Sequence, residues 1–186
     1  MANFRILAAE LLRWGKTHNL TGHRTLAGVV QDLFLDALAM APYVTGNSLL
    51  DIGSGAGFPG LPLALALPNL SVTLLEPRAK RVSFQRHAAR LMELAPRVTS
   101  VNGRAGCAEL AGRAFSTVTL RAVGSLGESL HLARPYLAPA GLLLLPRGLA
   151  DEDAARDLEL ATTQYQIPGL PTRLLVAAPA SRVAII

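Results

Sequence analysis

The sequence predicts an α/β fold in which a seven-stranded, mostly parallel sheet with crossover helices follows an N-terminal helical cap. Two patterns predict this fold. The first forty residues keep a helical spacing of apolar side chains, and from Ser48 onward short apolar runs alternate with helical patterns. The length of 186 residues and the hydrophobic content of 51% suffice for one substantial core. We therefore expect one main domain.

The cap is predicted from two amphipathic stretches. Residues 3–16 space their apolar side chains as one helical face, formed by Leu7, Leu11 and Trp14. A polar link, residues 17–24, leads to a second apolar stretch that ends before Pro42 and contains Val30, Phe34, Ala37 and Ala41. We expect residues 1–44 to form a helical cap that packs on a main domain of residues 45–186, in one globular unit.

Seven segments of the main domain are predicted as strands. Five are the apolar runs at residues 48–52, 70–75, 97–102, 116–120 and 141–146. The last two are the segments TTQYQIPGL and SRVAII near the C-terminus. An acidic helix is expected over residues 151–160. A second helix, with mostly basic charges, is expected over residues 78–94. Its apolar face, formed by Phe84, Ala88 and Leu91, is expected to contact the sheet. The opposite, charged face is formed by Arg78, Arg86, Arg90 and Glu93.

Composition argues against several classes of protein. The single cysteine, Cys107, forms neither an internal disulfide nor a cysteine-based zinc site, and the four histidines lack metal-ligand spacing, so we expect no metal. Glu10 and Arg13 interrupt the apolar N-terminus, unlike the core of a signal peptide. Prolines break the apolar run LPLALALPNLSVTLL before it reaches the length of a membrane span. We expect a soluble, cytoplasmic protein with no membrane partner.

Basic charge is concentrated in the first 150 residues, which carry 15 Lys and Arg against 8 Asp and Glu. Residues 151–186 carry 3 against 5, and the whole chain has a net charge of +5. Sixteen of the 18 basic residues are arginine, whose planar fork suits phosphates and guanine edges. Charge alone leaves two explanations open, nucleic-acid binding and a general preference for arginine.

A glycine-rich turn, LLDIGSGAGFPG, directly follows the first predicted strand and precedes a predicted helix. Gly53, Gly55 and Gly57 allow backbone angles and a close ligand approach that side chains would block. Asp51, at the carboxyl end of the strand, can accept hydrogen bonds from a ligand ammonium group or an ordered water. In open α/β sheets this edge is where ligands bind, so the turn is the predicted cofactor site.

Two cofactors fit a turn of this kind. Gly55, Gly57 and Gly60 match the dinucleotide fingerprint G-x-G-x-x-G, so an NAD-dependent enzyme is one hypothesis. S-adenosylmethionine (SAM) has no phosphate, and two features favour it. Asp51 stands two residues before the first glycine, where an acid gains nothing by facing a pyrophosphate. The bulky Phe58-Pro59 pair occupies the start of the helix, which a pyrophosphate needs to be open. A third hypothesis is that the glycine-rich turn is purely structural and binds no cofactor.

Glu76 ends the second predicted strand, about 20 residues beyond the turn, where an acid commonly holds the hydroxyl groups of a ribose. This role fits SAM and NAD equally. Arg78, Lys80 and Arg81 follow directly and place three cations beside the predicted cofactor site. They can steer a polyanion toward it.

Six segments together resemble the RsmG (also called GidB) family of small-subunit ribosomal RNA methyltransferases. Their order and spacing match over roughly residues 10–150, and the segments are WGKTHNLTGHR, LLDIGSGAGFPGLPLAL, VTLLEPRAKRVSFQ, GRAG, FSTVTLRAVGSL and LLLLPRG. The resemblance implies a Rossmann-like SAM-dependent methyltransferase fold with a seven-stranded sheet. It also implies methylation of nitrogen 7 of one guanine in 16S ribosomal RNA, with ribosomal RNA or the small ribosomal subunit as partner.

The resemblance also assigns site residues. Carried over by position, the SAM contacts are Gly53 and Phe58 in the turn, Ala105 and Gly106 at the adenine edge, and Arg121 after the fourth strand. Arg147 stands where the family has a lysine. Other departures from the family pattern are Gly106 in place of a glutamate, Asp32 and Leu33 in place of a basic residue and a histidine, and Ser116 in place of an aspartate.

Nitrogen 7 of guanine has a free lone pair, so the implied reaction needs in-line geometry and no general base. We therefore expect positioning residues, first Arg121 and then Arg147, instead of an acid or base. Two alternatives stay open: a SAM methyltransferase with another substrate, and a SAM- or RNA-binding module that has lost turnover. We expect a monomer.

Overall fold

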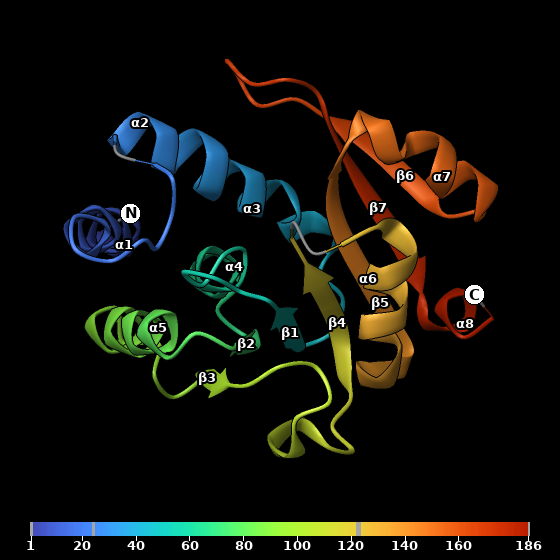
Figure 1. Ribbon diagram of the computed structural model, residues 1–186, viewed down its shortest axis with the longest axis horizontal. Helices are drawn as coiled ribbons and strands as arrows, with labels where there is room; N and C mark the ends of the chain where they lie inside the picture. Colours follow the sequence, from blue (N-terminus) through green and yellow to red (C-terminus); the bar gives the residue numbers. More distant parts are fainter. Residues whose placement is uncertain (1, 24, 122–123, 186) are drawn as a thin grey trace.

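The computed structural model describes residues 2–23, 25–121 and 124–185. Its centre is a seven-stranded sheet with the strand order β3-β2-β1-β4-β5-β7-β6. Neighbouring strands from β3 to β5 pair in parallel, whereas β7 is antiparallel to both β5 and β6. Helices cover both faces, with α4 and α5 on one side and α6, α7 and α8 on the other (Figure 1). The predicted α/β fold with a seven-stranded, mostly parallel sheet is confirmed.

The first five predicted strands are confirmed, with bounds that differ by at most four residues. They are β1 (Ser48–Ile52), β2 (Ser71–Glu76), β3 (Val98–Asn102), β4 (Phe115–Leu120) and β5 (Leu137–Gly148). Their apolar side chains are buried on both faces of the sheet. The strand sequences are therefore continuously apolar instead of alternating between apolar and polar residues. β5 is longer than predicted because it pairs with β4 on one side and β7 on the other.

The C-terminal prediction is partly wrong. The segment TTQYQIPGL does supply a strand, β6 (Ala161–Tyr165), but the last strand is β7 (Arg173–Pro179). The segment SRVAII, predicted as a strand, instead contributes to helix α8 (Ala180–Val183), and Ile186 lies outside the described residues. Pro179 ends the ladder, and the helix then turns Val183 into the core at 1% exposure.

The helices that pack on the sheet include α4 (Gly60–Ala66), α5 (Ala79–Leu91), α6 (Leu126–Ala133) and α7 (Glu152–Asp157). For α5 and α7, the predicted bounds of residues 78–94 and 151–160 differ from the observed ones by at most three residues. Leu91, predicted to face the sheet, is 47% exposed. The buried stripe of α5 runs through Val82, Gln85 and Ala89, with Phe84 and Ala88 beside it, so that Leu91 falls on the far side of the last turn.

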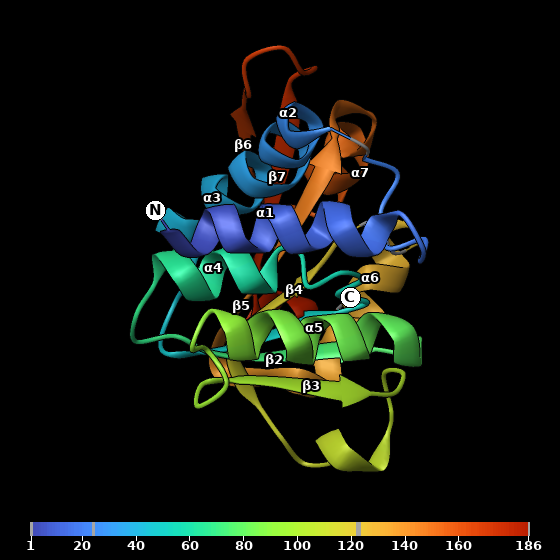
Figure 2. The same cartoon turned by 90° about the vertical axis from the view of Figure 1, so that its left-hand side faces the viewer.

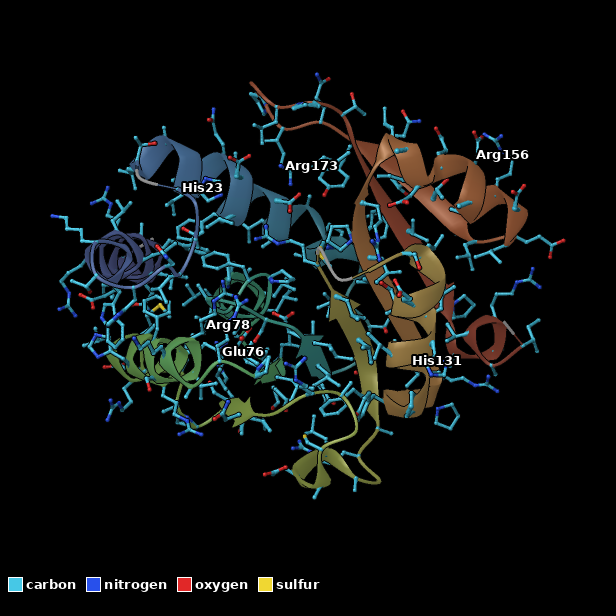
Figure 3. The ribbon with its side chains drawn as sticks, in the orientation of Figure 1. His23, Glu76, Arg78, His131, Arg156 and Arg173 are labelled. Carbon is cyan, nitrogen blue, oxygen red and sulfur yellow. The ribbon has the colours of Figure 1, made fainter. Side chains whose placement is uncertain are left out.

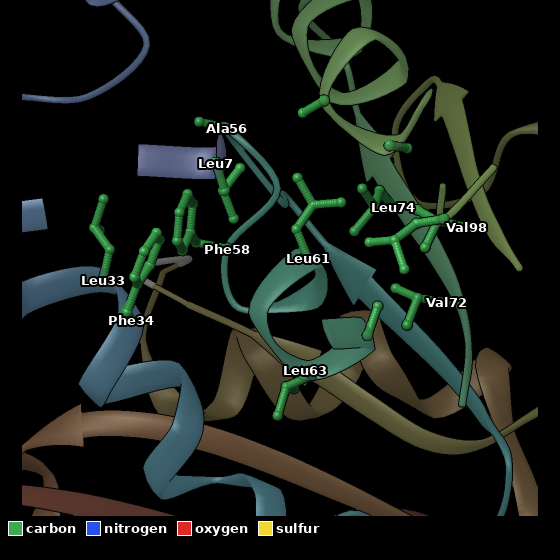
Figure 4. Close-up of a cluster of buried hydrophobic side chains, with 14 of the residues drawn as sticks. Leu7, Leu33, Phe34, Ala56, Phe58, Leu61, Leu63, Val72, Leu74 and Val98 are labelled. Carbon is green, nitrogen blue, oxygen red and sulfur yellow. The ribbon is translucent and has the colours of Figure 1, made fainter. Parts of the chain in front are cut away.

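The N-terminal residues form the predicted helices. Helix α1 (Ala2–Gly15) lies over α4 and α5, beside a second helical stretch made of α2 (Leu26–Val29), the π-helical segment Val30–Leu35 and α3 (Asp36–Ala39) (Figure 2). The wider π turn brings Leu33 and Phe34 into the core and leaves Val30 half-buried. Leu7, Phe34, Phe58, Leu61 and Leu74 belong to one apolar cluster, which joins these helices to the sheet (Figure 4).

By length and composition alone, Leu26–Tyr43 is the one stretch in the described part of the chain that matches a membrane-spanning helix. Its packing gives it another role. Leu33 and Phe34 are buried against the turn that follows β1, and Asp36, in the middle of the stretch, is 1% exposed and ion-paired. The stretch is therefore a core helix of this fold.

The Asp36 carboxylate connects that helix to the C-terminal half of the sheet. Its Oδ1 accepts a hydrogen bond from the Tyr165 hydroxyl at 2.6 Å and lies 2.7 Å from Nη1 of Arg173, while its Oδ2 lies 3.4 Å from Nη1 of Arg121. We call Asp36, Arg121, Tyr165 and Arg173 the Asp36 hub. Burial and the neighbouring carboxylate raise the pKa of Tyr165, so that its hydroxyl stays a donor.

Asp36→Ala is expected to lower the free energy of unfolding by about 3–5 kcal/mol, because it leaves two guanidinium groups without their buried partner. Tyr165→Phe, which removes one hydrogen bond of the hub, is expected to cost about 1 kcal/mol. Asp153→Ala is the control, since Asp153 is 89% exposed in its ion pair with Arg156. Denaturant unfolding measures all three, and equal stabilities of Asp36→Ala and Asp153→Ala would contradict the hub.

Candidate functional site

The turn after β1 depends on three glycines. Gly53, Gly55 and Gly57 have φ angles of +69°, +58° and +89°, all in the left-handed region that favours glycine. The Phe58–Pro59 peptide is cis, and helix α4 begins at Gly60. The chain thereby reverses direction within a few residues of the sheet and leaves the backbone of residues 53–56 at the carboxyl edge.

Two side chains from other elements hold this turn. Glu76, at the end of β2, accepts a hydrogen bond from the Gly55 amide at 2.9 Å, and its second oxygen accepts one from the Arg78 amide. Gln85 of α5 donates to Ser54 Oγ at 2.9 Å and to the Gly55 carbonyl at 2.8 Å. Sequence reasoning missed Gln85, although an amide on the apolar face of α5 is a detectable signal.

Asp51 lies beneath the turn and is fully buried. Its Oδ2 accepts a hydrogen bond from the Gly60 amide at 2.9 Å, whereas its buried Oδ1 has no hydrogen-bond partner among the described residues. Burial raises the pKa of Asp51 to about 7. The carboxylate is therefore an unsatisfied acceptor next to the turn, as expected for a group that receives a ligand cation or an ordered water.

A cavity of about 300 Å³ opens between the turn and the N-terminal helices, and we call it the turn cavity. One wall is the turn with Gly53, Ser54, Gly55, Ala56 and Phe58, and the opposite wall comes from residues 20–23 and Leu33. Arg81 and Arg121 complete the lining. The ring of Phe58 stacks on that of Phe34 at 5.6 Å, so the N-terminal helices fix one side of the cavity (Figure 4).

A second cavity of about 400 Å³ lies along the same sheet edge, and we call it the arginine cavity. Its lining comes from the ends of β4 and β5, the start of β7 and α3, and comprises Asp36, Arg121, Pro146, Arg147, Gly148, Asp151, Pro171, Thr172 and Arg173. Arg173 lies between the N-terminal helices and the β6–β7 end of the sheet (Figure 3). Arg121 lines both cavities, at the switch point between β1 and β4 where open α/β sheets bind ligands.

The other predicted site residues lie apart from the turn cavity. Ala105 and Gly106 follow β3 at the same sheet edge but do not line the cavity, and the Gly106 amide donates to the Tyr136 hydroxyl. The Arg147 side chain is 8% exposed and donates to the carbonyls of Gly124 and Ser125 and to Ser129 Oγ. Arg147 thus braces the start of α6.

Two of the departures from the family pattern have local explanations. Asp32 lies 3.2 Å from Nη2 of Arg173, with which it forms an ion pair beside the hub, and 3.5 Å from Nδ1 of His23. Ser116 lies near the start of β4, at the sheet edge opposite the cavities, and its Oγ donates to the Ser48 carbonyl at 2.8 Å. The change at position 116 is therefore remote from the site.

The cations predicted on one face of α5 differ in their environment. Arg78, Arg86 and Arg90 are all exposed, and Arg86 also donates to the Ser100 carbonyl at 3.0 Å; the neighbouring Lys80 is exposed as well. Arg78 lies close to Glu76 at the end of β2 (Figure 3). No group of three His, Cys, Asp or Glu suited to a metal ion occurs in residues 2–23, 25–121 and 124–185.

Comparisons with known proteins identify the family that this chain resembles. A family model described as rRNA small subunit methyltransferase G matches residues 1–175. The chain is 35% identical over 164 residues to a Coxiella burnetii protein named ribosomal RNA small subunit methyltransferase G, covering 87% of this chain and 79% of the relative. A Xanthomonas oryzae protein of the same name is 37% identical over 167 residues, with coverage of 87% and 78%.

Solved structures show the same fold. A methyltransferase from Geobacter sulfurreducens superposes with a TM-score of 0.67 at 18% identity, covering 93% of this chain and 89% of that one. An RNA methyltransferase from Salinibacter ruber, solved in complex with S-adenosyl-L-homocysteine, superposes with a TM-score of 0.58 at 19% identity, covering 77% and 87%. At these identities the likeness concerns the fold alone.

Gly55→Val is expected to abolish SAM binding while the fold is retained. A Cβ on Gly55 would have only Arg81 Nη1, at 3.7 Å, and the Gly53 carbonyl, at 4.0 Å, as near neighbours, so the larger side chain enters the turn cavity. Gly112→Val is the control, because Gly112 has a φ of +70° and nothing within 4 Å of an added Cβ. Calorimetric titration with SAM separates the two, and equal affinities would contradict the assignment.

Asp51→Asn is expected to remove a pH dependence of stability. Because the folded-state pKa of about 7 lies above the ordinary value of 3.8, the folded protein holds a proton that the unfolded chain releases. This stabilisation is present at low pH and is lost as the pH rises to 7. Between about pH 5 and pH 8, the unfolding free energy of the wild type should fall by about 2–3 kcal/mol relative to Asp51→Asn. Parallel curves from denaturant unfolding would contradict the raised pKa.

Proposed function

The chain belongs to the rRNA small subunit methyltransferase G family, and on this basis we propose that it methylates nitrogen 7 of a guanine in 16S ribosomal RNA with SAM as the methyl donor. The observation that carries the proposal is the turn cavity, which is lined by the left-handed glycines Gly53 and Gly55. The buried carboxyl groups of Glu76 and Asp51 lie behind this lining and accept hydrogen bonds from the Gly55 and Gly60 amides. Membership of the family is the basis for proposing an RNA substrate, and the turn cavity is the proposed binding site of the methyl donor.

The residues around the turn fit SAM better than a dinucleotide. The first amides of α4 are occupied, since the Gly60 amide donates to Asp51 and the Leu61 amide to the Gly57 carbonyl, so they are not free to hold a pyrophosphate. The unpaired Oδ1 of buried Asp51 suits a cationic ligand. We propose that Asp51, Glu76 and the backbone of Gly53, Gly55 and Gly57 hold SAM, with Phe58 as a wall and with Ala105 and Gly106 at the adenine edge.

SAM supplies a methyl group on a positively charged sulfur, which leaves as a neutral thioether. The lone pair of guanine nitrogen 7 forms the new bond, so the protein has no proton to remove and its contribution is position and the exclusion of water. Arg121 is the residue that we propose to contact the reacting groups, because it borders both cavities and is held by Asp36. Arg147 acts as a positioning residue through the start of α6.

We further propose that RNA approaches over the exposed cations Arg78, Lys80 and Arg90, which lie on α5 and just before it. Phosphates bound there would lie beside the end of β2 and hence near the turn cavity. A ribosomal substrate is consistent with a soluble, cytoplasmic protein. We propose that it acts as a monomer, with the N-terminal helices of residues 1–44 as a cap on the SAM-binding domain of residues 45–186.

The proposal predicts methyl transfer to 16S RNA that depends on nitrogen 7. With radiolabelled SAM, the protein should methylate a 16S transcript, or the small subunit reassembled from it, and should not methylate a transcript made with 7-deazaguanosine. The replacement keeps the pairing edge of guanine and changes only the reacting atom to carbon.

Other outcomes identify the alternatives. Transfer to small molecules and to no RNA would indicate a SAM methyltransferase with another substrate. SAM binding without transfer to any substrate would indicate a module that has lost turnover. Equal labelling of the 7-deazaguanosine transcript would overturn the proposed target atom while leaving RNA methylation in place.

A further inference from the structure

Asp151 is a carboxylate in the lining of the arginine cavity, and none of the described residues donates a hydrogen bond to it. It occupies the N-cap position of α7, yet its side chain makes no capping bond to the helix. Its closest charged neighbour is Nε of Arg147, at 3.9 Å, and its side chain is 34% exposed. Within the described residues no donor lies within hydrogen-bond distance of this carboxylate, so both oxygens can accept hydrogen bonds from a ligand in the cavity.

The other charges of the arginine cavity are already paired. Arg173 contacts Asp32 and Asp36, and Arg121 contacts Asp36, through one or two of the five N–H groups that each guanidinium carries. Both arginines therefore retain donors, while their net charge is compensated by the acids of the N-terminal helices. Among its described lining residues, the cavity thus combines guanidinium donors on one side with Asp151 on the other, a carboxylate whose ion pair with Arg147 spans 3.9 Å and which accepts no hydrogen bond.

We propose that the arginine cavity holds the target guanine and that Asp151 reads its Watson–Crick edge, accepting hydrogen bonds from N1–H and the 2-amino group. This inference rests on the proposed function and adds to it the residue that selects the base. A cavity of about 400 Å³ accommodates one purine, and Thr172, Pro146 and Pro171 provide its remaining lining.

The order of groups along the sheet edge matches the order of groups around guanine. Nitrogen 7 must face the methyl donor in the turn cavity. O6 is the next acceptor around the ring, and Arg121 stands between the two cavities as a donor for it. N1–H and the 2-amino group follow on the far side of O6, where Asp151 lies at the end of β5, beyond Arg121.

Adenine conflicts with the same arrangement at two points. Its 6-amino group would point a donor at the Arg121 guanidinium, and its N1 would point an acceptor at the Asp151 carboxylate. Each mismatch leaves a desolvated polar group unpaired, and sites built on hydrogen bonds reject such analogues most strongly. Asp151 together with Arg121 therefore separates the two purines.

Asp151 also lies where the reaction changes the charge of the base. When nitrogen 7 bonds to the methyl carbon, the electron pair of the broken carbon–sulfur bond stays on sulfur, and the positive charge passes to the purine. N1–H then becomes a stronger donor to the carboxylate. The interaction is thus stronger in the transition state than in the ground state, which is the condition for raising kcat.

Asp151→Asn is the test, and Asp153→Asn is the matched control. Both acids stand at the start of α7, but Asp153 is 89% exposed, is paired with Arg156 and lies outside the cavity. With the 16S transcript or reassembled subunit, Asp151→Asn should lower kcat/KM by about 10- to 100-fold, the range of a bidentate base contact, with kcat also reduced. SAM affinity and the thermal unfolding midpoint should match those of Asp153→Asn.

A binding measurement tests base selection separately. With S-adenosylhomocysteine present, the wild type should bind GMP more tightly than inosine monophosphate, which lacks the 2-amino group, and AMP most weakly. Asp151→Asn should reduce the affinity for GMP to that for inosine monophosphate, while Asp153→Asn keeps the wild-type order. Wild-type activity on RNA together with equal GMP affinity and equal kcat/KM for the two variants would overturn the role of Asp151. Absence of wild-type activity on any RNA would instead overturn the proposed function.

Discussion

The buried carboxylate of Asp36 is the interaction on which the geometry of the sheet edge depends. It comes from the N-terminal helices and binds Arg121 just after β4, Arg173 from β7 and the Tyr165 hydroxyl from β6, partners that are 85 to 137 positions away in the chain. A buried ion pair gains little stability over apolar packing, but removing one partner is costly. The hub therefore fixes how the N-terminal helices sit on the sheet, and this fixes both cavities.

The two cavities differ in their lining and are suited to different ligands. The turn cavity is built from backbone held by Glu76 and Gln85, with buried Asp51 below, and we propose that it holds the cofactor. The arginine cavity is built from side chains and suits a polar base. Arg121 borders both because β4 ends at the switch point of the sheet, where two ligands can meet at one side chain. A reaction that needs only alignment of a lone pair with a methyl group fits this division.

The sequence predicted the features that depend on local patterns. Six of the seven strands, the glycine turn and Glu76 follow from the local strand pattern and from residues close together in the chain. β7 was missed because its residues follow a proline-rich segment, and SRVAII was misread because its apolar residues resemble a strand when the helical turn after Pro179 is not known. The Asp36 hub and the Gln85 contact were missed because their partners are far apart in sequence, and only the fold brings them together.

The most direct measurement is mass-spectrometric mapping of methylated nucleotides in ribosomal RNA from cells with and without the gene for this protein. One 7-methylguanine of 16S RNA should disappear without the gene, return with the wild-type gene and stay absent with Gly55→Val. An unchanged methylation map of 16S RNA would contradict the proposed function, because the turn cavity would then serve a different substrate.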